Sequence, residues 1–183
     1  MNRKEFIKQL SILGIASQFT FIYSCDNIRT VVIPTNFNPL TEAEVKILAH
    51  VLEILFPSKQ SSPSVQQLNS LEHIIWNLND KNRDENTNKY IIKGINWVEE
   101  TANEEKETSF LNLSDSKKED LIEFISTKKW GKDWLSKILT LIFGSLVYDP
   151  IYNVNKEQSG WNWLQHKPGY PRPNKSTKYL AKS

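Results

Sequence analysis

Apolar residues recur every three or four positions through the middle of the chain, as they do on one face of an α-helix. No long alternation of apolar and polar residues, which would be typical of strands, occurs between residues 41 and 147. We therefore predict an all-α fold, an irregular bundle of about five helices. The five apolar stripes are Val45, Leu48, Leu52 and Leu55; Leu68, Leu71, Ile75 and Leu78; Ile91, Ile95 and Val98; Leu121, Phe124 and Ile125; and Leu135, Ile138, Ile142 and Leu146.

Helix starts are predicted where a hydroxyl residue precedes a Glu or Gln by three positions, the pattern of a capping box. In such a box the hydroxyl accepts a hydrogen bond from the third backbone amide, and the Glu or Gln side chain reaches back to the amide of the capping residue. Pro57 predicts the end of the first helix. The three candidate boxes are Thr41 with Glu44, Ser64 with Gln67, and Ser116 with Glu119.

The polar residues 79–88 predict an exposed loop between the second and third helices. The third helix is expected over about residues 89–103, where Gly94 lowers the intrinsic helix stability by up to about 1 kcal/mol relative to Ala. The dipeptide Trp130-Gly131 predicts a break before the fifth helix, which ends near residue 147.

The composition changes at residue 148, where prolines and large aromatic residues become frequent. The prolines exclude a continuous helix, so we predict an extended segment whose order comes from packing. The rings either cover one end of the bundle or also contact a partner, since aromatic side chains are enriched at protein interfaces. The residues concerned are Pro150, Pro168, Pro171 and Pro173, with Tyr148, Tyr152, Trp161, Trp163 and Tyr170.

Residues 1–24 have the three parts of a bacterial export signal, a basic start followed by an apolar stretch that is too short to span a bilayer. Arg3, Lys4, Phe6 and Lys8 resemble a twin-arginine export motif, in which Lys4 replaces the second arginine. The general secretory route remains the alternative. Either route places the chain in the bacterial cell envelope, on the periplasmic side.

Cys25 is the only cysteine, so an internal disulfide is impossible. It follows the apolar stretch and resembles the acylated cysteine of a bacterial lipoprotein. Ordinary cleavage and a retained membrane anchor are the alternatives. Multiple acyl chains on Cys25 would hold the protein firmly at a membrane. Residues 25–39 are then expected to tether the domain to that membrane.

The remainder of the chain after residue 24 is electrically balanced, with 20 basic and 20 acidic residues. A neutral domain gives no electrostatic reason to expect nucleic-acid binding. The glycines form neither of the common phosphate-binding loops, so the ordinary sequence evidence for a bound nucleotide or FAD is absent.

The candidate groups for catalysis or metal binding are few. His50, His73 and His166 belong to no metal-binding cluster, and we expect a lone histidine on a helix to be solvated or capping. No haem-attachment motif and no nucleophile-elbow pattern occurs. We therefore predict no catalytic, cofactor-binding or metal-binding residue in this chain.

The carboxy-terminal motif resembles a known family. It reads Asp149-Pro150-x-Tyr152-x-x-Asn155, then Gly160-Trp161 and Pro168-Gly169. This is similar to the end of the gluconate 2-dehydrogenase subunit 3 family, and Leu40-Thr41-x-x-Glu44 and Phe56-Pro57 agree with the family's front. The resemblance covers about residues 38–173. One departure is Asn153-Val154, which stands where the family usually has Gly-Gly.

The resemblance implies a small, non-catalytic subunit beside a large FAD-bearing oxidoreductase of the glucose-methanol-choline type, with a c-type cytochrome that carries haem c as electron acceptor. It also implies that the small subunit supports the export and stability of the flavoprotein. Substrates among relatives include gluconate, glucose and glycosides oxidised at carbon 3. We expect the partner contacts to be made by Tyr152, Asn155, Trp161, Trp163 and Tyr170.

The resulting organisation is an export signal over 1–24, a tether over 25–39, a helical domain over 40–173 and a flexible end over 174–183. Two other functions stay open. The chain could be a stand-alone envelope lipoprotein that binds a carbohydrate through the same aromatic residues, or a hydrolase. A neighbouring reading frame for a flavoprotein without its own signal would favour the subunit.

Overall fold

The computed structural model describes residues 38–58 and 62–178. Every regular element in these ranges is helical, so the predicted all-α fold is confirmed. Five of the described helices have ten residues or more, as the apolar stripes predict. The elements are α2 (Glu42–Leu55), α3 (Ser70–Asn79), α4 (Glu85–Lys106), η1 (Phe110–Asn112), α5 (Asp115–Thr127), α6 (Lys129–Val147), η2 (Pro150–Tyr152), η3 (Lys156–Gln158) and α7 (Ser159–Leu164).

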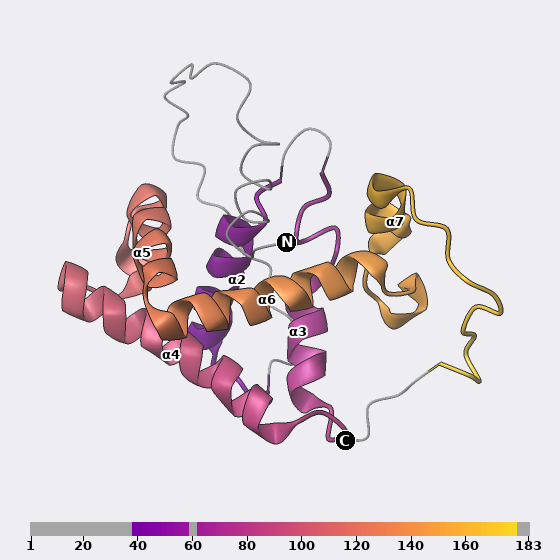
Figure 1. The fold of residues 1–183 in the computed structure, drawn as a ribbon, viewed down its shortest axis with the longest axis horizontal. Helices are drawn as coiled ribbons and strands as arrows, with labels where there is room; N and C mark the ends of the chain where they lie inside the picture. The colour runs from indigo at the N-terminus through magenta and orange to yellow at the C-terminus, as the bar shows by residue number, and fades with distance from the viewer. Residues whose placement is uncertain (1–37, 59–61, 179–183) are drawn as a thin grey trace, which may run out of the picture. The chain divides into compact units, whose positions relative to one another are not determined.

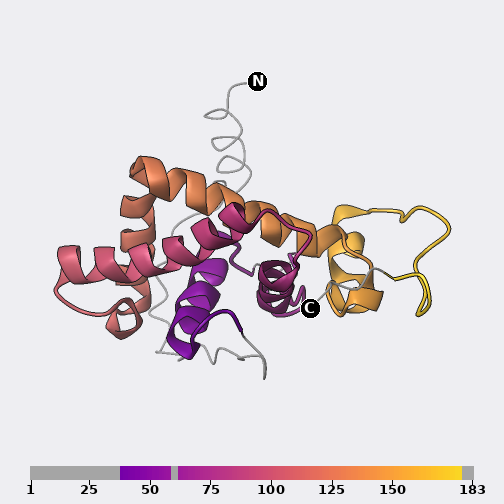
Figure 2. The same cartoon turned by 90° about the horizontal axis from the view of Figure 1, so that it is seen from below.

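Helix α6 is the element that the other helices share. It contacts α2, α3, α4, α5 and α7, and it passes in front of α2 and α3 in Figure 1. In Figure 2, α2 and α3 both lie below it. Its predicted stripe, from Leu135 to Leu146, is buried. The end of α6 therefore positions everything that follows in the chain relative to the core.

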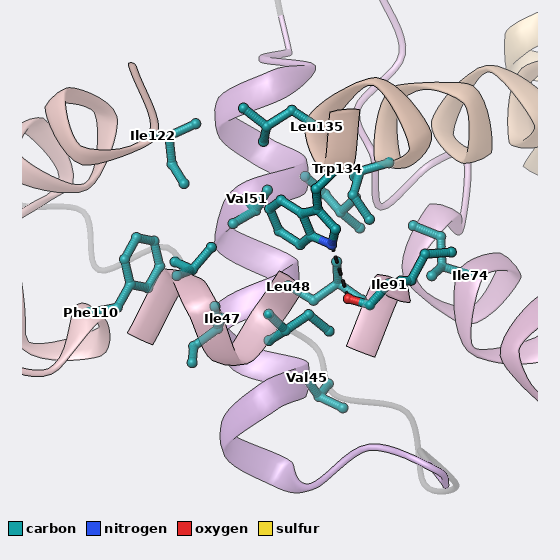
Figure 3. Close-up of a cluster of buried hydrophobic side chains, with 14 of the residues drawn as sticks. Val45, Ile47, Leu48, Val51, Ile74, Ile91, Phe110, Ile122, Trp134 and Leu135 are labelled. Carbon is teal, nitrogen blue, oxygen red and sulfur yellow. Dashed lines mark hydrogen bonds between the residues drawn. The ribbon is translucent and has the colours of Figure 1, made fainter. Parts of the chain in front are cut away.

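The indole of Trp134 on α6 is fully buried at the centre of this core (Figure 3). Its Nε1 donates a hydrogen bond of 2.9 Å to the backbone oxygen of Ile91 on α4. The ring lies directly against Gly94, where an added Cβ would come within 2.1 Å of it. Gly94 lowers the helix propensity of α4, but the absence of a side chain at this position allows α4 and α6 to approach closely.

The first predicted helix start is confirmed. The hydroxyl of Thr41 accepts from the amide of Glu44, and the Glu44 carboxylate accepts from the amide of Thr41 at 2.7 Å. The second box also forms, between Ser64 and Gln67. However, the turn that follows this box ends at Asn69, whose φ is 54°. Helix α3 therefore begins at Ser70, later than the box predicts.

Three other predicted boundaries are wrong. Helix α4 starts four residues earlier than expected because Asp84 caps it, accepting from the amide of Thr87 at 2.8 Å. Helix α5 starts after Ser114, so the Ser116 box does not form. The break before α6 lies at Lys128, and Gly131 is helical. An added Cβ on Gly131 would lie 2.0 Å from the Ile125 backbone oxygen, so this glycine marks close packing.

The carboxy-terminal segment is not extended throughout, contrary to the sequence prediction. Its first half folds into the short helices η2, η3 and α7, and residues 165–178 contain no helix. Short helices form here because left-handed residues at Asn153, Asn155 and Gln158 end one turn and start the next. Pro150 stands at the first position of η2, where a proline is tolerated, and the other prolines lie beyond α7.

Several predictions lie outside the described residues. These are the export signal, Cys25 with its tether up to residue 37, and the last five residues of the chain. In the ranges that the structure does describe, we find no helix that is both long and apolar enough to cross a membrane. The motif residues that remain predictions are Arg3, Lys4, Phe6, Lys8 and Cys25.

The contact between Gly94 and Trp134 leads to a stability prediction. Gly94→Ala should raise the helix propensity of α4 by about 1 kcal/mol but force the buried indole to move, with an overpacking cost of about 1–3 kcal/mol or more. We expect a net loss of stability in urea denaturation. Gly169→Ala is the matched control, because no atom lies within 4 Å of the added Cβ there. A Gly94→Ala variant more stable than wild type would contradict this account of the core.

Candidate functional site

The carboxy-terminal segment is held against α3 and α6 by Asn155, a residue of the predicted partner contacts. Its side chain is fully buried, accepts from the amide of Gly160 at 2.7 Å and donates to the Tyr148 backbone oxygen at 3.1 Å. Its backbone amide donates to the backbone oxygen of Leu68 at 3.0 Å. Asn155 therefore closes the loop between α6 and α7 and ties it to the turn before α3.

Trp161 fills the space between α7 and the end of α6. Only 3% of it is exposed, and its Nε1 donates to the Val147 backbone oxygen at 3.0 Å. The preceding residue must be small, since an added Cβ on Gly160 would lie 2.5 Å from the backbone oxygen of Leu146. The Gly-Trp pair is thus a packing element within the chain.

Asp149 and Arg172 fix the last described part of the chain. The guanidinium donates to both carboxylate oxygens, at 2.9 and 3.2 Å, and lies over the Trp161 ring at 4.9 Å. These hydrogen bonds hold the pKa of Asp149 below its ordinary value. Asp149 also caps η2 by accepting from the Ile151 amide. The sequence carries no signal for this pairing, because the two residues are 23 positions apart.

Several large hydrophobic side chains near this end of the described chain are exposed. Among the described residues, all exposed side chains of this kind lie between positions 143 and 170. We call this set the carboxy-terminal exposed residues. It consists of Phe143 (39% exposed), Val147 (48%), Trp163 (40%), Leu164 (45%) and Tyr170 (87%).

A pocket of about 210 Å³ lies between α3 and the loop that follows α6. Three of its residues come from α3 and four from the loop. Most of the lining is aromatic, and it contains one carboxylate. The lining residues are Glu72, His73, Trp76, Tyr148, Tyr152, Asn153 and Val154.

His73 forms the inner part of this pocket. It is 4% exposed, and its ring packs against the rings of Trp76 and Tyr148 with centroid distances of 6.3 and 4.7 Å. Burial, with a contribution from the charge of Arg83, lowers the pKa of His73 to about 4. The expectation of a solvated or capping histidine is therefore wrong here. The buried ring is neutral at physiological pH and lies within hydrogen-bond distance of the Asn77 amide, 3.2 Å.

Within the two described ranges, no group of three or more His, Cys, Asp or Glu side chains is placed to hold a metal ion. What the arrangement provides is an ordered aromatic surface, a small pocket and a rigid connection to the core.

Residues 42–169 match the family described as gluconate 2-dehydrogenase subunit 3. The chain belongs to this family. The resemblance identified from the carboxy-terminal motif is thereby confirmed, and the chain is an accessory subunit of a dehydrogenase complex. No curated protein and no solved structure was found to match it.

The departure from the family's Gly-Gly is accommodated by the backbone. Asn153 has φ of 61°, a left-handed conformation that asparagine tolerates better than most other residues. Its side chain donates to the Glu72 carboxylate at 2.9 Å, a contact that glycine could not make. Val154 is buried. Asn153 thus adopts a left-handed conformation that glycine would also allow, and it adds a polar contact at the pocket.

The five predicted partner contacts divide into three groups by their exposure. Asn155 and Trp161 are buried, and their polar atoms form hydrogen bonds within the chain. In this structure their side chains are therefore not accessible to a partner. Tyr152 is half-buried and lines the pocket. Trp163 and Tyr170 are exposed, and their contact with a partner stays a prediction.

The low pKa of His73 predicts a pH dependence of stability. The unfolded chain binds a proton on this residue near pH 6.5 and the folded chain only near pH 4, so stability falls as the pH drops through this interval. Between pH 7 and 5 the free energy of unfolding should fall by about 2 kcal/mol more in wild type than in His73→Gln. Urea denaturation at several pH values measures this difference. Parallel curves for the two proteins would show that His73 is not buried as described.

Proposed function

We propose that this chain is the non-catalytic small subunit of a membrane-associated, FAD-dependent sugar or sugar-acid dehydrogenase. The complex would be of the gluconate 2-dehydrogenase or glycoside 3-dehydrogenase kind. In this proposal FAD is bound by a large glucose-methanol-choline type subunit, and a c-type cytochrome carries haem c. The small subunit supports export, stability and membrane placement of the flavoprotein.

The confinement of the carboxy-terminal exposed residues to one end of the described chain carries the proposal. The best-exposed ring is that of Tyr170, and Trp163 and Leu164 add further apolar surface on α7. Aromatic anchors that become buried in an interface provide a large share of binding energy. A subunit of an obligate complex is expected to expose such side chains when it is described alone.

The arrangement behind these residues supports docking without rearrangement. Asn155 and the pair of Asp149 and Arg172 fix the segment that carries Trp163 and Tyr170. A segment ordered in advance loses less conformational entropy when it binds. The buried residues of the family motif thus contribute to binding by positioning the exposed ones.

Membrane attachment belongs to the same proposal. Acylation of Cys25 would hold the subunit, and with it the flavoprotein, at the membrane surface. The signal residues Arg3, Lys4, Phe6 and Lys8 would direct export of the folded pair. What supports this part is the amino-terminal sequence together with membership of the family.

Removal of two exposed rings tests the docking role. Trp163→Ala/Tyr170→Ala should weaken the complex with the flavoprotein, by about 2 kcal/mol or roughly 30-fold in Kd for each ring that acts as an anchor. Co-purification from the membrane fraction, followed by flavin absorbance, measures the loss. Trp97→Ala is the matched control, since it removes a half-buried ring from α4.

Circular dichroism verifies that each variant remains folded.

Cys25→Ala should leave the complex intact but release it from the membrane fraction. Full recovery of flavoprotein with the double variant would contradict the docking role of these residues. If the complex with Cys25→Ala stays bound to the membrane, the lipid anchor is contradicted, but the docking role of the exposed rings is not.

A further inference from the structure

We propose that the pocket between α3 and residues 148–154 is a binding site for the guanidinium group of an arginine side chain on the dehydrogenase subunit. This inference rests on the proposed function for the source of the arginine. The pocket itself is defined by seven lining residues of this chain and a volume of about 210 Å³.

The size of the pocket fits one side chain. Sites that enclose drug-sized ligands have volumes of roughly 300–1,000 Å³. The pocket is smaller, and its rings contact one another in series, which keeps their positions fixed. Tyr148 and Tyr152 lie with centroids 5.9 Å apart, and Tyr148 packs on His73. A rigid aromatic wall of this kind suits a planar group that stacks on rings.

The charges that line the pocket favour a cation. Glu72 is the one ionisable acid among the lining residues, and its Oε2 accepts from the side-chain amides of Asn69 and Asn153, at 2.6 and 2.9 Å. These bonds hold the carboxylate in place. His73, with its low pKa, adds no positive charge. The nearby Arg83 donates to the Asn77 side chain and does not line the pocket, but its charge acts on His73. A cation is therefore expected on the Glu72 side of the pocket, away from its inner end.

Aromatic faces attract cations, and a carboxylate accepts charge-assisted hydrogen bonds from guanidinium. Because Glu72 Oε2 already accepts from two side-chain amides, the guanidinium would donate to Oε1. Arginine combines both modes of recognition, whereas lysine presents a compact, strongly hydrated charge. A sugar acid such as gluconate would be repelled by Glu72. The lining therefore selects a cation over the anionic substrate of a sugar-acid dehydrogenase.

The position of the pocket points to a protein as the source of the cation. The same end of α6 that carries Phe143 and Val147 also forms the pocket, because Tyr148 follows directly. At Gly144 an added Cβ would lie 3.1 Å from His73 Nε2, so α6 also bounds the inner ring. A partner that covers Phe143 and Val147 thus lies next to the pocket.

Titration of the isolated chain tests the recognition of guanidinium. The probes are N-acetyl-arginine amide and its neutral analogue N-acetyl-citrulline amide, followed by tryptophan fluorescence and by NMR. We expect saturable binding of the arginine probe only, weakened about tenfold or more in Glu72→Gln. Glu119→Gln, an exposed carboxylate on α5, is the matched control. Equal binding of both probes, or none, would overturn the inference.

A second arm uses the whole complex. Glu72→Gln and Trp76→Leu should each weaken binding of the flavoprotein about tenfold, and Glu119→Gln should not. If wild type binds the flavoprotein and both pocket variants bind it equally well, the pocket inference fails while the proposed function stands. If wild type binds no dehydrogenase, the proposed function fails, and saturable binding in the probe titration still supports the pocket as a guanidinium site.

Discussion

The fully buried indole of Trp134, seated against Gly94, is the contact on which the other features depend. It brings α6 close to α4 and sets the position of α6 relative to the other long helices. Because the carboxy-terminal segment begins where α6 ends, the same contact determines where the segment lies. A shift of α6 relative to α4 would displace the residues that follow α6, including the exposed rings and the part of the pocket that those residues line.

The residues of the family motif mainly make contacts within the chain. Asp149, Asn155 and Trp161 use their polar groups within the chain, and Asn155 and Trp161 are buried. They order a segment that would otherwise have little regular structure, and this order presents Trp163 and Tyr170 to solvent. Asp149, Asn155 and Trp161 thus support the exposed surface by positioning other residues, whereas Tyr152 of the same motif lines the pocket.

Local patterns predicted the helices well, whereas features that depend on distant residues escaped them. The stripe of α6 and the box at Thr41 depend on neighbours within four positions, and both were correct. The burial of His73 depends on Tyr148, and the clamp on Asp149 depends on Arg172, far along the chain. The late start of α3 depends on the left-handed Asn69, which no periodicity reveals.

Amide hydrogen exchange of the subunit, free and bound in its dehydrogenase complex, tests the central claim most directly. The account predicts that binding slows exchange in the last turns of α6 and through residues 148–170, and leaves α4 and α5 unchanged. New protection concentrated on α4 and α5, with residues 143–170 exchanging as in the free chain, would contradict it.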